Sequence, residues 1–232
     1  GAPAGQSSVT PISLDAIEEF QIVVSPYDVR QAGFTGAGIN AITRSGTNTP
    51  KGSLFYYGRN EEFVGKTPTA VDSLRKKLDG FTDWSMGIRV GGSIVESKLF
   101  YFVNGEFTRY LQPLTRTFGS PDIRTNTFTV RQDSLDMLSN FLKTKYGYDP
   151  GPWSGIDFIR ESDKLFTRLD FNVGDNHKLT ARWSYLHSVE DNTPSRGRSA
   201  TDIYADYGRY KLENKTHSVG LQLTSVFGNA AS

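Results

Sequence analysis

Three histidines are the first candidates for chemistry in this sequence of 232 residues. Imidazole is a common metal ligand and general base, and a motif such as H-E-x-x-H places two imidazoles on one face of a helix. His177, His187 and His217 stand at no such spacing, and we expect them in one turn and two strands. The histidines therefore predict no metal centre.

Carboxylates are the second candidates, because glycoside hydrolysis and calcium binding both use them in groups. Glu61 lies next to Glu62, and Asp149 and Asp157 share a polar stretch in which carboxylates are ordinarily solvated. The run GFTGAG resembles a dinucleotide-binding loop only in its glycines, since no helix is expected after it. No nucleophile elbow, P-loop or calcium-binding loop is present, so we predict a protein that is not an enzyme and that has no cofactor.

A basic cluster at Arg196–Arg198 is the third candidate, since guanidinium groups pair well with phosphate or lipopolysaccharide. In a polar loop the ordinary state of such a cluster is solvated. Over the whole chain, 26 Lys and Arg nearly balance 25 Asp and Glu and leave a formal net charge of +1. This balance creates no broad positive field, so nucleic acid is not an expected partner.

The elements that position these residues are predicted to be strands. Apolar and polar residues alternate in six segments, and in the clearest of them Trp84, Met86 and Ile88 share one face while Ser85 and Arg89 share the other. The six segments are Gly52–Arg59, Trp84–Ile94, Leu99–Tyr110, Leu165–Val173, Leu179–Tyr185 and Val219–Phe227.

The connections between these segments alternate between long and short. Long polar stretches at about 60–83, 111–161 and 189–210 alternate with the tight turns Val95–Lys98 and Gly174–His177. Outer-membrane barrels place long loops outside the cell and short turns on the periplasmic side. We predict an all-β fold in which six up-and-down antiparallel strands form part of a transmembrane β-barrel. The alternative is a two-sheet β-sandwich with one solvated face per strand.

The polar face of these strands is assigned to the barrel interior. Charged side chains are costly against lipid and are readily accommodated in a water-filled lumen. The predicted lumen-facing residues are Arg89, Glu106, Arg168, Asp170 and Arg182. In the long third loop, apolar residues at helical spacing predict a short extracellular helix over Asp133–Tyr146, with Asp133 as its N-cap.

The first 50 residues have a different pattern and are predicted to form a separate domain. Ser13 is expected to cap a helical turn over Leu14–Glu18. Two buried strands, Phe20–Val24 and Gly36–Thr43, are expected to follow, and Arg44–Pro50 reads as a linker. We therefore divide the chain into residues 1–50 and residues 51–232.

Residues 12–60 resemble the junction between plug and barrel in TonB-dependent receptors, most closely the Oar-like group of Bacteroidetes and myxobacteria. In that family the plug ends with a phrase like G-G-x-x-N-x-x-T-K/R-x-G-T-N. It is preceded by a pattern like D-x-I-E-x-x-x-V. The matching residues are Asp15, Ile17, Glu18, Ile22 or Val23, Gly36, Gly38, Asn40, Thr43, Arg44, Gly46, Thr47 and Asn48.

The resemblance implies a bacterial outer-membrane receptor that binds an extracellular ligand and imports it with energy from TonB. The expected partners are the TonB complex, acting through a plug segment absent from this chain, together with the remainder of the receptor barrel, the membrane lipid and an unknown ligand. Complete barrels of this kind close with about 22 strands. The candidate ligand-facing residues on the plug surface are Tyr27, Arg30, Gln31 and Phe34.

A secreted or surface adhesin, or a carbohydrate-binding module, built on a β-sandwich is the competing reading. In that case the apolar faces of the strands would form a dry core between two sheets. A porin-like protein without energy coupling is a third reading.

Overall fold

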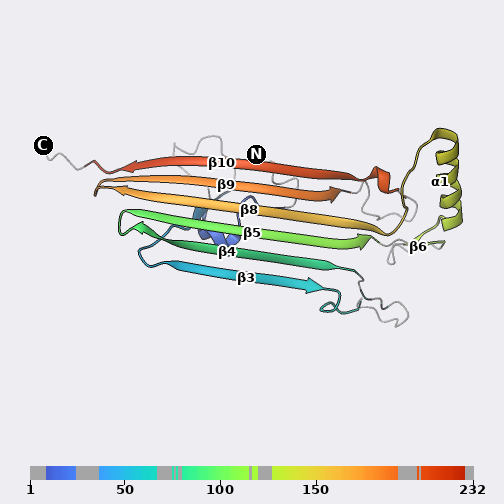
Figure 1. Ribbon diagram of the computed structural model, residues 1–232, viewed down its shortest axis with the longest axis horizontal. Helices are drawn as coiled ribbons and strands as arrows, with labels where there is room; N and C mark the ends of the chain where they lie inside the picture. The colour runs from blue at the N-terminus through green and yellow to red at the C-terminus, as the bar shows by residue number, and fades with distance from the viewer. Residues whose placement is uncertain are drawn as a thin grey trace.

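The computed structural model describes residues 9–24, 37–66, 75, 77, 80–114, 117–119, 127–192, 203 and 205–227. Its main feature is one six-stranded antiparallel sheet with the strand order β10-β9-β8-β5-β4-β3 (Figure 1). The strands are β3 (Lys51–Asn60), β4 (Thr82–Val95), β5 (Leu99–Leu114), β8 (Ile156–Val173), β9 (His177–Asn192) and β10 (Tyr210–Ser225). Each long strand pairs with the next long strand along the chain, which confirms the predicted up-and-down arrangement.

Four of the strands, β5, β8, β9 and β10, extend several residues further toward the long loops than the sequence predicted. β5 continues to Leu114, where it pairs with Ile156 at the start of β8, and β9 continues to Asn192, which pairs with Tyr210. The predicted loop limits at Leu111, Glu161 and Val189 were therefore wrong, whereas the limit at Tyr210 agrees with the start of β10. Backbone hydrogen bonds between neighbouring strands continue after the side-chain alternation has stopped.

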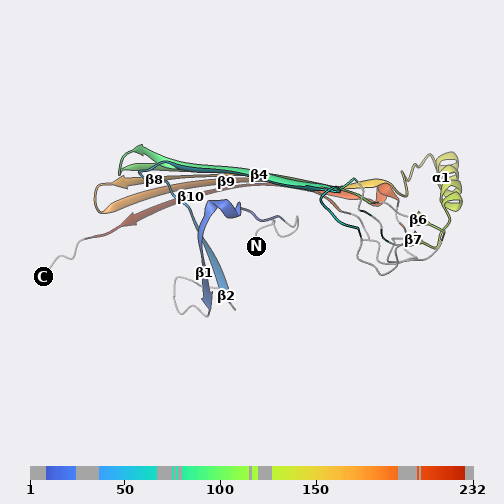
Figure 2. The same cartoon turned by 90° about the horizontal axis from the view of Figure 1, so that it is seen from below.

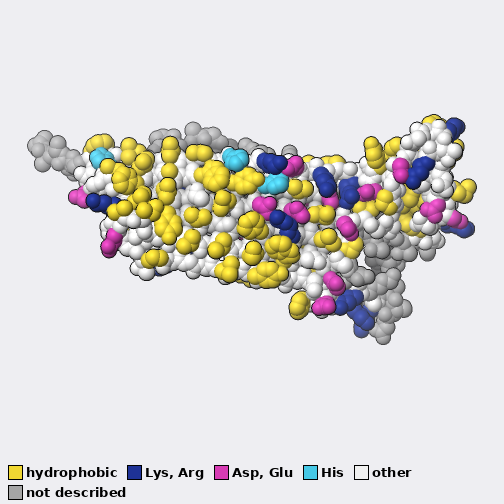
Figure 3. Space-filling view, viewed as in Figure 1, with side chains coloured by type: hydrophobic (Ala, Val, Ile, Leu, Met, Phe, Trp, Pro, Cys, Tyr) yellow, Lys and Arg dark blue, Asp and Glu magenta, His cyan; other side chains and the backbone are white. Residues whose placement is uncertain are grey.

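One face of the sheet is apolar and uncovered. Figure 3 shows hydrophobic side chains over much of this face, with a histidine and a few charged side chains at the tight-turn end and more charged side chains toward the loop end. We call it the outward face. Its large apolar residues at least 38% exposed are Leu54, Tyr56, Met86, Ile88, Val90, Ile94, Phe107, Leu169, Phe171, Val173, Leu179, Val219, Leu221 and Leu223.

The opposite face carries the N-terminal segment, by which we mean the described residues between Val9 and Asn48. It contains a 3-10 turn, η2 (Leu14–Ala16), followed by the hairpin of β1 (Ile17–Val24) and β2 (Ala37–Thr43), which projects away from the sheet (Figure 2). Ser13 caps η2 as predicted, but the turn ends at Ala16 because Ile17 already pairs with Thr43. We call the sheet face beneath this segment the inward face.

A small apolar cluster joins the N-terminal segment to the sheet. Ala16 is fully buried against Phe102 of β5 and Phe166 of β8, and Ile12 packs at its edge. The two phenylalanine rings are tilted by 58° with centroids 6.2 Å apart. The larger share of this contact is polar.

The predicted helix in the long third loop is present as α1 (Gln132–Tyr146), at the loop end of the sheet (Figure 1). Asp133 is not its N-cap, so that prediction was wrong. Arg131 holds the cap position without a side-chain cap bond, and the Asp133 carboxylate accepts hydrogen bonds from Arg131. Two short parallel strands in the same loop, β6 (Thr117–Phe118) and β7 (Thr127–Phe128), pair with each other.

No helix in the described ranges has the length and apolar character needed to cross a bilayer.

Candidate functional site

Asp15 is the centre of the first polar contact between the N-terminal segment and the inward face. Its carboxylate lies 3.0 Å from Arg89 Nη1 of β4 and accepts a hydrogen bond of 3.3 Å from Ser53 Oγ of β3. Its carbonyl accepts hydrogen bonds from Arg89 and from Arg44. The tight turn of η2 makes this possible, because it exposes the Asp15 side chain and carbonyl together toward the sheet.

Glu106 of β5 is the centre of the second contact. One carboxylate oxygen accepts a hydrogen bond of 2.6 Å from Ser13 Oγ, and the other lies 2.7 Å from Lys164 Nζ of β8. Lys164 also donates to Thr10 Oγ1, and its side chain is only 8% exposed. Both ends of this buried ion pair therefore contact the N-terminal segment.

Arg168 of β8 makes the third contact. Its Nη1 donates to the carbonyl of Thr43, at 2.6 Å, and to the Thr43 hydroxyl. Its other nitrogens hold the nearly fully buried carboxylate of Asp170 at 2.7 and 3.0 Å, and Thr180 donates to the same carboxylate. Because the guanidinium bridges a carboxylate and a backbone carbonyl, it fixes the end of β2 against the sheet.

Gly46 brings the linker into direct contact with the backbone of the sheet. A Cβ atom at this position would lie less than 3.0 Å from the carbonyl oxygens of Gly92 and Tyr101. Both neighbours are backbone atoms, which cannot move aside as a flexible side chain does. Only glycine fits here, which gives a physical reason for the glycine in the motif that residues 36–48 match.

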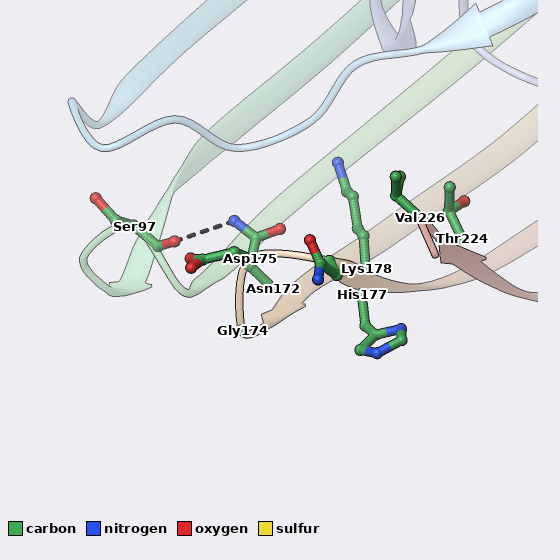
Figure 4. A pocket seen from close by; sticks show the side chains of 9 residues that line it. Ser97, Asn172, Gly174, Asp175, His177, Lys178, Thr224 and Val226 are labelled. Atoms are coloured by element: carbon green, nitrogen blue, oxygen red, sulfur yellow. Dashed lines mark hydrogen bonds between the residues drawn. The ribbon is translucent and has the colours of Figure 1, made fainter. Parts of the chain in front are cut away.

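Asn48 ties the linker to the tight turns. Its Oδ1 accepts a hydrogen bond of 2.8 Å from the Ser97 backbone N–H, and its Nδ2 donates to Ser97 Oγ. Ser97 has a left-handed backbone with φ of 58°, and its carbonyl accepts from Asn172 Nδ2 at 3.0 Å (Figure 4). The linker and two neighbouring turns thus form one hydrogen-bonded unit at the turn end, beside a small pocket.

We expect Asn48→Ala to destabilise this unit by about 1–2 kcal/mol, because it removes two hydrogen bonds and leaves the Ser97 N–H without its side-chain acceptor. The measurement is the midpoint of thermal unfolding of the full-length protein in detergent. Ser97→Gly is the comparison, since glycine tolerates the left-handed backbone and keeps the N–H donor. A lower midpoint for Ser97→Gly than for Asn48→Ala would contradict the importance assigned to Asn48.

The structure brings four of the five predicted lumen-facing residues into contact with the N-terminal segment or with one another. Arg89 and Glu106 touch it directly, and Arg168 contacts it while holding Asp170. Arg182 lies on the same face, since it pairs directly with Arg168 across β8 and β9, but its guanidinium donates to Gln222 of β10. The assignment of this face to a barrel lumen stays a prediction.

The four candidate ligand-facing residues lie outside the described residues. They are Tyr27, Arg30, Gln31 and Phe34.

Sequence reasoning missed Ser13, Ser53 and Lys164 as contact residues. Ser53 and Lys164 lie on the inward face together with Arg89 and Arg168, so the period-2 pattern could have included them. From sequence, Ser13 is predicted only as a helix cap. Its hydroxyl performs both roles, because it accepts from the Asp15 N–H while donating to Glu106.

The loop end of the sheet carries a second set of ordered contacts. Residues 150–152 dock against the 3-10 turn η5 (Asp206–Gly208), with backbone hydrogen bonds from Asp206 and Tyr207. The rings of Tyr148 and Tyr207 meet edge to face with centroids 5.3 Å apart. Two loops that are distant in the sequence therefore form one unit.

Asp149 connects this unit to α1. Lys143 Nζ lies 2.9 Å from its carboxylate, and the hydrogen bond from Lys143 holds the pKa of Asp149 below its usual value. Any stability that this exposed pair contributes is present at neutral pH and is lost as the pH falls through the lowered pKa.

Neither set of contacts has the arrangement of a catalytic centre. Within the described ranges, no group of three or more histidine, aspartate or glutamate side chains is placed to hold a metal ion. The inward-face contacts are ion pairs and hydrogen bonds between two parts of the chain. Such contacts can hold a polypeptide segment against the inward face of the sheet.

Comparison with known proteins gives two matches. Residues 42–151 match the family model described as outer membrane beta barrel domain. The chain is also similar to the TonB-dependent transporter Oar of Myxococcus xanthus, with 27% identity over 147 residues. That alignment covers 57% of this chain and 13% of the transporter, so the chain matches a small part of that protein. No solved structure matches the chain.

The sheet topology, its apolar outward face and these matches define a segment of a bacterial outer-membrane β-barrel. Within that class, the chain resembles TonB-dependent transporters, as the sequence motifs predicted.

Proposed function

We propose that this chain is the end of the plug and the first strands of the barrel of a TonB-dependent transport receptor. The observation that carries the proposal is the seat of the N-terminal segment on the inward face, through Asp15, Glu106 and Arg168. A plug must stay inside its barrel while the outward face meets lipid. Polar contacts on one face and exposed apolar side chains on the other satisfy both requirements.

Under this proposal the inward face lines the barrel interior, residues 1–50 belong to the plug and residues 51–232 belong to the barrel. The long loops and the plug surface around residues 27–34 would contact the ligand. TonB would act on a plug segment outside this chain, and the remaining strands would come from the rest of the receptor. The contacts through Arg168 and Glu106 would keep the end of the plug on the inward face of the barrel when TonB pulls on the plug.

The sandwich adhesin receives less support from the structure. A sandwich needs a second sheet packed on the apolar face of the first. In the described part of the chain, the apolar face has no such cover, and the N-terminal segment lies on the polar side (Figure 2). A porin-like protein without energy coupling would have the same kind of barrel. The experiment must therefore distinguish uptake that requires TonB from uptake that does not.

The test compares which compounds the source cells remove from their medium. Three strains are grown side by side: wild type, a strain lacking this receptor, and a strain lacking functional TonB. We expect at least one compound to be depleted by the wild type and to remain in the medium of both mutants. Depletion that requires the barrel but not TonB would indicate a porin-like protein, and unchanged depletion without the receptor would contradict a role in uptake.

A further inference from the structure

On the outward face the apolar side chains form a band, and the loop-side end of this band shifts along the strand direction between β4 and β10. Going toward the loop end, β3 and β4 carry no charged or histidine side chain on this face, and Trp84 is the last large apolar residue of β4. On the other strands the first such side chain on the loop side of the apolar residues is Arg109 on β5, Asp163 on β8, His187 on β9 and His217 on β10, while His177 lies on this face at the turn end of β9.

The hydrogen-bonded register shows that this boundary does not follow the rows of the sheet. Met86, Phe107, Asp163, His187 and Lys215 are paired in one row that crosses five strands. The row begins with apolar side chains on β4 and β5 and ends with a lysine on β10. A membrane surface parallel to this row would bury Asp163 and Lys215 in hydrocarbon or expose Met86 to water.

The turn end of the band shifts in the same direction. β3 begins at Lys51, which pairs with Gly91, while β4 and β5 continue toward their turn as far as the pair of Val95 and Leu99. β8, β9 and β10 continue still further, to the pairs that His177 makes with Val173 and Ser225. From β3 to β10, the loop-side end and the turn-side end of the apolar band therefore both shift toward the tight turns.

The size of the displacement gives an angle. Trp84 shares a row with Glu213, yet the first histidine or charged residue on β10 is His217, so the boundary shifts by at least four residues between these strands. Four residues span about 14 Å, and four strand spacings span about 19 Å. The boundary therefore crosses the rows at about 36°, which agrees with the tilt of roughly 35–45° of strands in membrane barrels.

We propose that the outer surface of the membrane crosses this sheet obliquely, from the loop side of Trp84 on β4 to His217 on β10. The outward side chains of β8, β9 and β10 beyond this line then lie outside the hydrocarbon. Between the line and the turn end, β4 keeps 12 residues (84–95) and β10 keeps eight (218–225), close to the roughly 9 to 11 residues that a tilted membrane strand needs. The partner of the outward face is lipid up to this line and the headgroup layer immediately beyond it.

The side chains next to the line have the chemistry expected at a membrane surface. On the apolar side, Trp183 and Tyr185 of β9 pack against the ring of His217, with centroids 6.0 and 4.9 Å away. Aromatic rings of this kind are enriched at the headgroup level. These rings lie at the loop-side end of the apolar band on β9 and β10.

On the polar side, a chain of ion pairs crosses four strands on the outward face. Arg109 lies 2.7 Å from Asp163, and His187 lies between Asp163, at 3.8 Å, and Glu213, at 2.9 Å. Lys215 pairs with Glu213 at 2.7 Å. Such a network is costly in hydrocarbon and favourable among hydrated headgroups.

Single cysteines in one row test the proposal, since this chain has no cysteine of its own. The full-length receptor carries Met86→Cys or Lys215→Cys, with any cysteine elsewhere replaced, and intact cells are treated with a charged maleimide that does not cross membranes. We expect Lys215→Cys to react about tenfold faster than Met86→Cys, because a barrel-strand tilt places the two residues at different depths. Trp84→Cys and Glu213→Cys form a second pair in the next row, with the same expectation.

Two controls complete the test. Val219→Cys lies below the line on β10 and should be protected like Met86→Cys, and every variant should react fully after denaturation. Equal labelling or equal protection of Met86→Cys and Lys215→Cys would show that the boundary follows the row, and would overturn the proposal. Labelling of Val219→Cys in intact cells would overturn the assignment of the outward face to lipid. Both results are independent of cargo and of TonB, so they leave the transport proposal to its own test.

Discussion

Gly46→Val is expected to move the linker away from the sheet and to weaken the contact of the whole N-terminal segment with the inward face. The Cβ atom would meet two backbone carbonyl oxygens, those of Gly92 and Tyr101, which belong to paired strands and cannot retreat. Overpacking of this kind costs about 1–3 kcal/mol and sometimes more, and here there is no side chain to repack. We expect a lower unfolding midpoint of the full-length receptor and faster protease cleavage near residues 44–50.

Gly65→Val is the matched control for Gly46→Val. Position 65 lies in a loop, and nothing is within 4 Å of where its Cβ would be. The same substitution there should leave the unfolding midpoint and the cleavage rate unchanged. If Gly46→Val behaves like Gly65→Val, the linker does not rest on the sheet in the way that the structure describes.

The strands in the apolar band were predictable from sequence because one face of each strand is apolar and the other is polar. The predicted segment Trp84–Ile94 corresponds to β4, and the short turns are where they were expected. A shift of one residue would exchange the two faces, so the alternation also fixes which residues lie together. For this reason Arg89 and Arg168 could be assigned to one face without a structure.

The parts of the strands beyond the band were not predictable in this way. In β8, Asp157 and Asp163 lie on one face while Arg160 and Lys164 lie on the other, so both faces are polar and the alternation disappears. A stretch of this composition resembles a loop. It is held as a strand by backbone hydrogen bonds to β5 and β9, which a pattern of side chains does not report.

The contacts of the N-terminal segment were also beyond sequence reasoning. Ser13 is 93 positions from Glu106, and Thr10 is 154 positions from Lys164. Nothing in the local pattern links such distant positions. The motif around Gly46 indicated a junction, but which strands it touches follows only from the way the linker lies on β4 and β5.

Removing the charge of Lys164 is the second change with a large expected effect. Lys164→Met would leave the Glu106 carboxylate, only 16% exposed, with Ser13 as its remaining hydrogen-bond partner. Breaking one side of a buried ion pair typically costs about 3–5 kcal/mol, because the other charge stays buried without compensation. We expect a loss near the lower end of this range in the free energy of unfolding, measured by denaturant titration of the full-length receptor in micelles.

The double variant Lys164→Met/Glu106→Gln separates an unpaired charge from lost packing. Glutamine keeps a partner for Ser13 and carries no charge, so the double variant should recover at least half of the loss. Lys143→Met, which breaks the exposed pair with Asp149, is the surface control and should have a much smaller effect. If the double variant is as unstable as the single one, Lys164 stabilises the inward face of the sheet by the packing of its side chain and not by its charge. In that case the contact with Glu106 and Ser13 does not hold the N-terminal segment by charge.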